Sequence, residues 1–228
     1  MGEMIEFPSN GSTGGGYLAT PATGGGPGLV VIQEWWGLVP HITDVVDRFA
    51  SEGFVALAPD LYHGTKVPPS EPDEAGKQMM ALQLDRAGKD LSGAVDEVRS
   101  RASGSGVGVV GFCMGGGLAL VLACQRPDAV TACVAFYGVI PWPEAQPDYS
   151  ALAAPVLAHV AADDDFFTPA AAAELKATLE GLGKEMELHV YEGVSHAFFN
   201  DTRPEVYDAA AAGTSWRRTV DFLHAQLR

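Results

Sequence analysis

A cysteine lies between two glycines where a predicted strand gives way to a predicted helix. The stretch is GVGVVGFCMGGGLALVLAC, residues 106–124, with Cys113 in a Gly-x-Cys-x-Gly pattern. In the serine form of this pattern, the nucleophile occupies a strained strand-to-helix turn that exposes it at the sheet edge. The amide of the next residue, Met114, is then free to face an oxyanion, and the helix N-terminus favours a thiolate. The pattern predicts nucleophilic catalysis by Cys113.

A nucleotide-binding fold is the alternative interpretation of this glycine-rich turn, with Cys113 simply buried in it. That fold would place Gly-x-Gly-x-x-Gly after the first strand, and the sequence has no such motif there. Cys124 and Cys133 lie within apolar runs, where we interpret them as small core residues. The three cysteines have no zinc-type spacing.

A catalytic cysteine needs a base, and four histidines follow Cys113 in the chain. His159 and His189 lie within apolar strands, and His224 lies in the last turns of the closing helix, so we expect none of them to act. His196 differs because it follows the last strand, in YEGVSHAFFN, from where an imidazole could reach the sheet edge. We expect His196 to be the general base.

The order nucleophile, acid, histidine predicts a carboxylate between Cys113 and His196. The segment VAADDDFFTP has three carboxylates at the end of a predicted strand: Asp163, Asp164 and Asp165. One of them would orient the imidazole, and the other two would be loop and cap residues. Counting back from Pro169 favours Asp165, with Asp164 as the alternative.

Apolar runs bounded by turn residues alternate with longer amphipathic stretches, which predicts a mostly parallel sheet with helices on both faces. Predicted strands cover 28–37 with its following loop, 54–62, 107–112, 129–138, 154–165 and 184–193. Predicted helices cover 41–53, the second half of 70–102, 114–126, 168–183 and 203–227. Residues 1–27 are predicted to contain a glycine-rich hairpin. No repeat or linker divides the chain, so we expect a single domain over 1–228 without a separate lid domain.

The composition suits a globular protein that is strongly acidic. Hydrophobic residues make up 47% of the chain, and 14 basic against 29 acidic residues give a net charge of -15. This charge argues against nucleic acid or an anionic membrane as a partner, and an anionic substrate would need a local basic anchor. No apolar run is long enough to span a bilayer, and the first residues lack the features of a signal peptide. We therefore expect a cytoplasmic protein.

Five segments, in order along nearly the whole chain, resemble the dienelactone hydrolase (carboxymethylenebutenolidase) family of α/β-hydrolases. They are VVIQEWWGL (30–38), ALAPDLY (56–62), GFCMGG (111–116), ADDDFFTP (162–169) and YEGVSHAFFNDTRP (191–204). A cysteine in the strand-to-helix turn separates this family from most of its serine relatives. The resemblance implies an α/β-hydrolase fold and hydrolysis of a lactone or ester through a thioester acyl-enzyme, with no metal and no cofactor.

The resemblance also implies roles for individual residues. Cys113 would be the nucleophile, His196 the base and then the acid, and Asp165 the orienting acid. The backbone amides of Trp35 and Met114 would form the oxyanion hole.

Glu34 matches a glutamate that lies beside the nucleophile in this family and takes part in converting the thiol to a thiolate. The surroundings of Glu34 agree, because a carboxylate among apolar neighbours is unfavourable to bury without a partner. Trp35 and Trp36 follow directly, and they either line a pocket or cover the core.

The chain departs from dienelactone hydrolases proper, which hold the substrate carboxylate with two arginines. No arginine lies between Arg48 and Arg86. The second arginine position, four residues after His196, is Asn200, and Arg203 is the nearest cation. Arg203 is either a substitute anchor or a surface residue at the start of a helix.

The expected partner is a small-molecule ester or lactone, and the expected assembly is a monomer or small homo-oligomer. A broad carboxylesterase with a different natural substrate is the first alternative function. A ligand-binding protein on a hydrolase scaffold is the second, although such a protein has no need for a complete triad. A thiol redox role is weaker still, because no second cysteine lies near Cys113 in the sequence.

Overall fold

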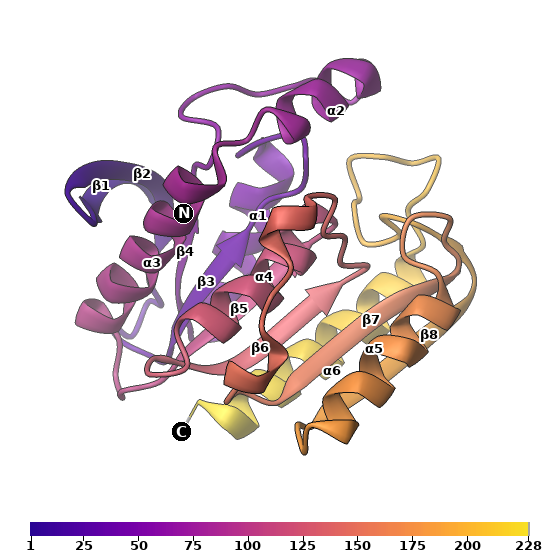
Figure 1. The fold of residues 1–228 in the computed structure, drawn as a ribbon. Helices are drawn as coiled ribbons and strands as arrows, with labels where there is room; N and C mark the ends of the chain where they lie inside the picture. Colours follow the sequence, from indigo (N-terminus) through magenta and orange to yellow (C-terminus); the bar gives the residue numbers. More distant parts are fainter. Residues whose placement is uncertain (228) are drawn as a thin grey trace.

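The computed structural model describes residues 1–227, which form one eight-stranded sheet flanked by helices (Figure 1). The sheet order is β1-β2-β4-β3-β5-β6-β7-β8. The strands are β1 (Glu3–Ser9), β2 (Ser12–Ala19), β3 (Gly28–Ile32), β4 (Val55–Pro59), β5 (Val107–Phe112), β6 (Val130–Phe136), β7 (Val156–Asp163) and β8 (Met186–Ser195). Strand β2 is antiparallel to β1 and β4, and every other pair is parallel. The prediction of a mostly parallel α/β sheet is confirmed.

Helices cover both faces of the sheet. They are α1 (Pro40–Ser51), α2 (Pro72–Met80), α3 (Leu84–Arg101), α4 (Met114–Gln125), α5 (Pro169–Gly181) and α6 (Ala209–Gln226), with short 3-10 turns at Pro143–Ala145 and Tyr149–Ala151. Helices α1 and α6 pack on one face, and α3, α4 and α5 pack on the other. Helix α2 lies beyond the strands at the top of Figure 1, where Ala75 packs against Trp36 and Val67. None of the helices within 1–227 combines the length and apolar character needed to cross a bilayer.

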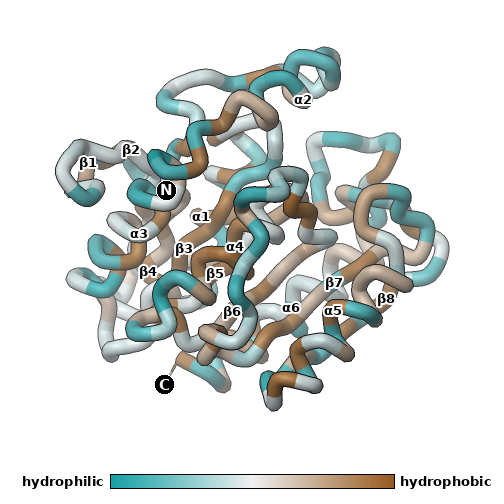
Figure 2. The backbone as a smooth tube through the Cα atoms, viewed as in Figure 1, coloured by the Kyte–Doolittle hydropathy of each residue, from teal (hydrophilic) through white to brown (hydrophobic). Residues whose placement is uncertain are grey.

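The central strands are apolar on both sides because both sides are covered. In β3, Val30 and Ile32 point into the core beneath α3 and α4, while Leu29 and Val31 point toward α1 and α6. A strand buried on both faces has a continuous apolar run rather than an alternating one. Figure 2 shows this as hydrophobic colour along the central strands and α4, with polar residues on α2.

Two predicted regions differ from the structure. The region 70–102 contains the helix expected in its second half, α3, and also a second helix, α2, in its first half. The closing helix begins at Ala209, not at 203, because the side chain of Asp208 accepts a hydrogen bond from the Ala211 amide at 2.7 Å and caps the helix there. Residues 203–208 are therefore part of a loop beside the site.

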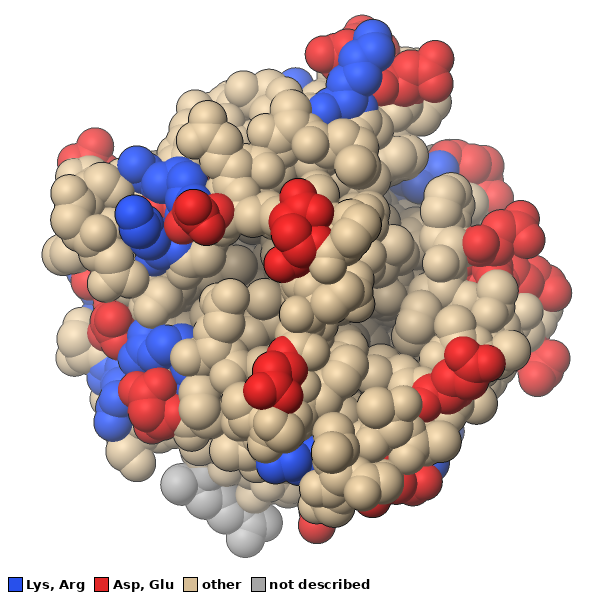
Figure 3. Space-filling model, viewed as in Figure 1, with Lys and Arg blue, Asp and Glu red and all other residues tan. Residues whose placement is uncertain are grey.

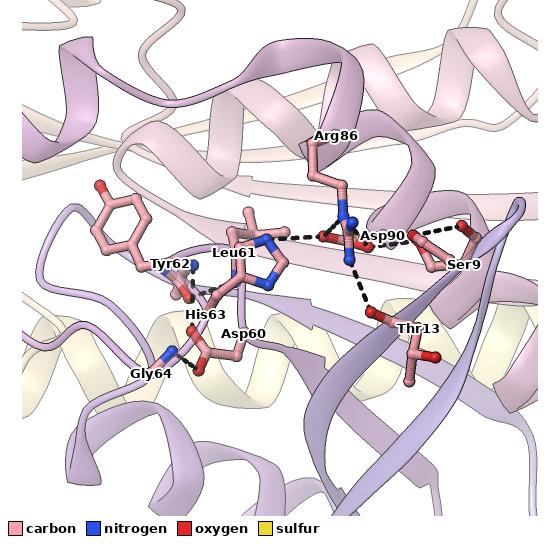
Figure 4. Close-up of polar contacts among 11 residues, drawn as sticks. Ser9, Thr13, Asp60, Leu61, Tyr62, His63, Gly64, Arg86 and Asp90 are labelled. Carbon is pink, nitrogen blue, oxygen red and sulfur yellow. Dashed lines mark hydrogen bonds and ion pairs between the residues drawn. The ribbon is translucent and has the colours of Figure 1, made fainter.

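The N-terminal hairpin is joined to the domain through a buried carboxylate on α3 (Figure 4). Asp90 is 1% exposed and accepts a hydrogen bond from the hydroxyl of Ser9 on β1. Its carboxylate also lies 3.1 Å from Arg86 Nε and 3.3 Å from His63 Nε2. Arg86 in turn donates to the Thr13 carbonyl of β2 at 2.7 Å. One carboxylate thus links β1, β2, α3 and the loop after β4.

We expect Asp90→Ala to lower the free energy of unfolding by about 3 kcal/mol, because it leaves cationic and hydroxyl partners without their acceptor. Urea unfolding followed by circular dichroism measures the change. Lys89→Ala is the matched control, since Lys89 is an exposed neighbour on the same helix, and we expect it to stay within about 0.5 kcal/mol of the parent. If Asp90→Ala lowered the free energy of unfolding no more than Lys89→Ala does, the contacts of Asp90 would not stabilise the fold.

Candidate active site

Cys113 occupies the turn between β5 and α4, as its glycine-flanked pattern predicts. Its backbone has φ 55° and ψ −122°, a left-handed φ that is unfavourable for a residue with a Cβ. The Cys113 amide donates to the Phe136 carbonyl at 3.0 Å. The Cys113 carbonyl accepts from the amides of Gly116 and Val139 at 2.9 Å and 3.0 Å. Such strain persists at functional sites because the surrounding structure fixes it.

The flanking glycines are required because backbone approaches backbone at this turn. A Cβ on Gly111 would lie 1.9 Å from the Gly115 carbonyl oxygen. A Cβ on Gly115 would lie 2.4 Å from the Ile32 carbonyl oxygen. The two glycines therefore let β5 and α4 meet closely beside the end of β3, and this contact sets the position of the thiol between them.

His196 follows β8, and its imidazole lies between a carboxylate and the thiol. The carboxylate is that of Asp164, whose Oδ2 lies 2.8 Å from His196 Nδ1. Asp164 is 4% exposed, and its Oδ1 accepts from the amides of Phe166 and Phe167 at 2.8 Å and 2.9 Å. Cys113 lines the same cavity as this imidazole and is among the groups that raise the pKa of His196. The structure thus brings a thiol, an imidazole and an aspartate together at one site.

The structure places Asp164, and not the preferred Asp165, beside His196. Asp165 is exposed and lies at the cavity rim, where no hydrogen bond joins it to His196 among the described residues. Strand β7 ends at Asp163, and the next side chain, Asp164, turns inward to the imidazole. Counting back from Pro169 assumes a fixed loop length before α5, whereas counting forward from the strand end finds the buried carboxylate.

Burial of the imidazole opposes its protonation and by itself lowers the pKa of His196. The hydrogen bonds with Asp164 and Cys113, together with the charges of these groups, act in the other direction and raise the pKa of His196 to about 10. At neutral pH the imidazole therefore holds a proton. A protonated imidazole in this position can donate its proton to a departing alcohol.

We expect this histidine to make the folded protein less stable as the pH rises from about 6.5 to about 10. An unfolded histidine releases its proton near pH 6.5, whereas the folded chain keeps it until about pH 10. The stabilisation is thus complete below pH 6.5 and is lost as the pH rises through the folded-state pKa. Melting temperatures of wild type and His196→Gln, measured from about pH 6 to 10, check this. If the difference in melting temperature between wild type and His196→Gln did not change with pH, the expectation would be wrong.

Glu34 follows β3 and is 1% exposed. Asn200 Nδ2 donates to Glu34 Oε2 at 2.6 Å, which supplies the partner that a buried carboxylate needs. The Asn200 Oδ1 accepts from the amide and hydroxyl of Thr202 at 3.1 Å and 2.7 Å. Glu34 and Cys113 line the same cavity.

The remaining predicted site residues surround this centre. Trp35 is half-buried at the cavity, and the 2% exposed Trp36 packs edge-on against it with ring centroids 5.0 Å apart. Both tryptophans line the cavity, and Trp36 also packs on α2. Met114 is the buried first residue of α4, directly after Cys113. The Arg203 guanidinium lies 5.6 Å from the centre of the Trp36 ring and also lines the cavity.

The cavity has a volume of about 330 Å³, enough for a small organic substrate. Its wall combines the centre just described with apolar side chains contributed by several loops and by α2. The lining residues are Glu34, Trp35, Trp36, Met79, Cys113, Val139, Asp163, Asp165, Phe166, Ser195, His196, Ala197, Arg203 and Val206.

Tyr137 also lies at the site, although it was not predicted from the sequence. Its φ is 38°, its hydroxyl has no hydrogen-bond partner within residues 1–227, and its ring centroid lies 4.9 Å from that of His196. Burial, followed by the charges of Glu34 and Cys113, raises its pKa. A tyrosine at the end of an apolar run resembles a core residue. However, β6 lies beside β5, and the carboxyl ends of neighbouring parallel strands share one edge, which is the signal that could have found it.

The other histidines after Cys113 lie where the sequence places them, away from the thiol. His159 is fully buried between the hydroxyls of Thr219 and Tyr191, at 3.0 Å and 2.8 Å. Burial lowers the pKa of His159 well below the ordinary value and keeps it neutral. His189 pairs with Glu187 on β8, and His224 is exposed on α6.

Comparison with known proteins agrees with the fold and the motifs. The model of the "Dienelactone hydrolase family" matches residues 15–227. The chain is 38% identical to "Protein usf" of Aquifex pyrophilus over the whole of both chains. It is 30% identical to a carboxymethylenebutenolidase of Pseudomonas putida, over 94% of this chain and 92% of that one.

A solved structure from Klebsiella pneumoniae, described as "Putative Dienelactone Hydrolase", superposes with a TM-score of 0.88. It has 26% sequence identity, and the match covers 98% of both chains. The chain therefore belongs to the dienelactone hydrolase family, and the protein is a hydrolase of the carboxylic ester class.

Proposed function

We propose that the protein hydrolyses a lactone or small carboxylic ester through a thioester formed on Cys113. The observation that carries this proposal is the position of the His196 imidazole, which is hydrogen-bonded to the Asp164 carboxylate and lines the same cavity as the Cys113 thiol. A binding protein gains nothing from such an arrangement, whereas a thiol nucleophile needs a proton carrier that a carboxylate orients.

In the first half of the reaction, the Cys113 thiolate attacks the acyl carbon and the carbonyl electron pair moves to the oxygen. The backbone amides of Trp35 and Met114 are the proposed donors to that oxyanion, and each donor of this kind is worth about 3 kcal/mol of barrier. When the carbon–oxygen single bond breaks, the departing alkoxide takes the proton of His196. In a lactone, the alcohol remains part of the same molecule.

In the second half, neutral His196 takes a proton from water, and the hydroxide attacks the thioester carbon. The carbon–sulfur bond then breaks, the acid is released, and the thiolate and protonated imidazole return. Asp164 holds the imidazole orientation and stabilises its charged form throughout.

Acyl-enzyme trapping tests the proposal. On rapid mixing with 4-nitrophenyl acetate, we expect a burst of nitrophenol and one acetyl group on Cys113, located by peptide mass mapping of acid-quenched samples. Steady hydrolysis of cis- and trans-dienelactone, measured beside the ester, separates a lactonase from an esterase. Neither turnover nor an acetyl adduct with any of these substrates would indicate a ligand-binding protein instead.

We expect Glu34→Gln to keep the fold and to lower kcat/KM for 4-nitrophenyl acetate by about 100-fold. The glutamine carbonyl can still accept from Asn200, so the local hydrogen bond is kept while the charge beside the thiol is lost. Unchanged turnover would remove Glu34 from the mechanism.

A further inference from the structure

The cavity around Cys113 carries an unusual balance of charge for a site that would hold a carboxylate. Three acidic side chains line it: Glu34, Asp163 and Asp165. The cationic side chains among its lining residues are His196 and Arg203. His196 is engaged by Asp164 and the thiol, so Arg203 is the remaining cation to examine.

Arg203 already has an acidic partner. Its Nε donates to Glu205 Oε1 at 2.8 Å, and its guanidinium lies over the ring of Trp36. The pKa of Glu205 is lowered, first by a hydrogen bond from its own amide and then by Arg203, so its carboxylate stays ionised beside the guanidinium. A substrate carboxylate would have to compete with this existing partner.

Asn200 cannot supply a positive charge that would attract a substrate carboxylate. The amide is neutral, its Nδ2 donates to Glu34, and its Oδ1 accepts from Thr202. Asn200 therefore keeps Glu34 in place but presents no positive charge to the cavity. Among residues 1–227, the lining of the cavity thus contains no cation free of an acidic partner.

Apart from Ser195, the rest of the wall is apolar or aromatic, with Trp35, Met79, Val139, Phe166 and Val206 among its members. The faces of aromatic rings carry partial negative charge and do not favour an anion. Figure 3 shows acidic side chains over the loops that follow β7 and β8, beside the hollow on this face. Acidic side chains therefore outnumber basic ones in the cavity lining.

We propose that the cavity selects esters or lactones whose acyl part is uncharged and discriminates against those that carry a carboxylate. This inference rests on the proposed function, because it names the substrate class for the same centre. An anionic acyl group would meet three carboxylates and no free cation, whereas a neutral one would contact the apolar wall. The discrimination arises from the rim acids, from the neutral Asn200 and from the pairing of Arg203 with Glu205.

Two esters of equal chain length test the selection: 4-nitrophenyl hexanoate, which ends in a methyl group, and the 4-nitrophenyl monoester of adipic acid, which ends in a carboxylate. At low ionic strength we expect kcat/KM to be about 30-fold higher for the hexanoate, from Coulomb repulsion at the rim and desolvation of the carboxylate. The ratio should fall at about 0.5 M salt, because screening weakens the repulsion by exposed acids.

Removing the charges of the exposed acids that line the cavity tests whether these acids cause the discrimination between the two esters. In the double variant Asp163→Asn/Asp165→Asn, we expect kcat/KM for the adipate monoester to rise about fivefold and the ratio of the two esters to narrow. The control is Asp44→Asn/Asp221→Asn, which removes the same charge from exposed sites on α1 and α6. In the control the ratio should stay within about twofold of wild type, because these acids do not line the cavity.

A binding measurement keeps this inference separate from the proposed function. Hexanamide and the monoamide of adipic acid are compared as protectants of Cys113 against iodoacetamide, read by intact mass. Protection at about tenfold lower concentration by hexanamide supports the selection even if neither ester turns over, a result that would reject only the proposed function. Equal protection, or equal kcat/KM for the two esters, would overturn the selection.

Discussion

Replacing Cys113 by alanine is expected to lower kcat/KM for 4-nitrophenyl acetate by at least about 10⁴-fold, while the melting temperature changes by only a few degrees. The thiol is the proposed atom that bonds to the acyl carbon, and His196 has no other group to activate at that position. The side chain is small and lies in a turn held by main-chain hydrogen bonds, so alanine should preserve the fold. Steady-state assays and thermal unfolding of both proteins measure the two effects.

Cys124→Ala is the matched control for this experiment. Cys124 is buried on α4 away from the cavity, and burial raises its pKa to about 11, which keeps it a thiol. We expect its activity to stay within about twofold of wild type and iodoacetamide to inactivate it normally. If Cys113→Ala kept more than about a tenth of the wild-type activity, the thioester mechanism would be wrong.

Replacing Asp164 by asparagine is expected to lower kcat by about 10³- to 10⁴-fold with little change in KM. Asparagine keeps the shape but not the charge, so the imidazole loses the group that fixes its tautomer and stabilises its protonated form. Thermal unfolding checks that the variant folds. The pH dependence of kcat should also shift, because Asp164 contributes to the raised pKa of His196.

Asp165→Asn distinguishes the two neighbouring carboxylates. Asp165 lies at the rim, so its replacement should lower turnover of a neutral ester by no more than about threefold. If instead Asp165→Asn caused the large loss and Asp164→Asn the small one, Asp165 would be the orienting acid in solution. This pair of variants therefore decides which of the two carboxylates orients the imidazole.

The sequence predicts the architecture because the central strands are apolar on both faces and the helices carry their own start and end signals. Proline at the start of α5 and the Thr168 cap are such signals. The start of the closing helix was harder to predict. In 203–227 the composition favours a helix throughout, but the hydrogen bond from Ala211 to Asp208 starts it later.

The candidate site was predicted where a residue follows directly from its strand or turn. Cys113 and His196 each follow a strand end, and the structure brings them together. Asp164 required knowledge of how far β7 extends, and Tyr137 required the order of the strands in the sheet. Neither can be read from local composition, because both depend on which strands become neighbours.

The close packing of Gly111 and Gly115 has a consequence for directed evolution of this enzyme. No side chain fits at either position without moving main-chain atoms, so libraries that include them will return mostly unfolded protein. Met79, Phe166 and Val206 instead reach the cavity from α2 and from the loops after β7 and β8. Mutagenesis confined to these three positions should change the substrate range while the reacting centre stays intact.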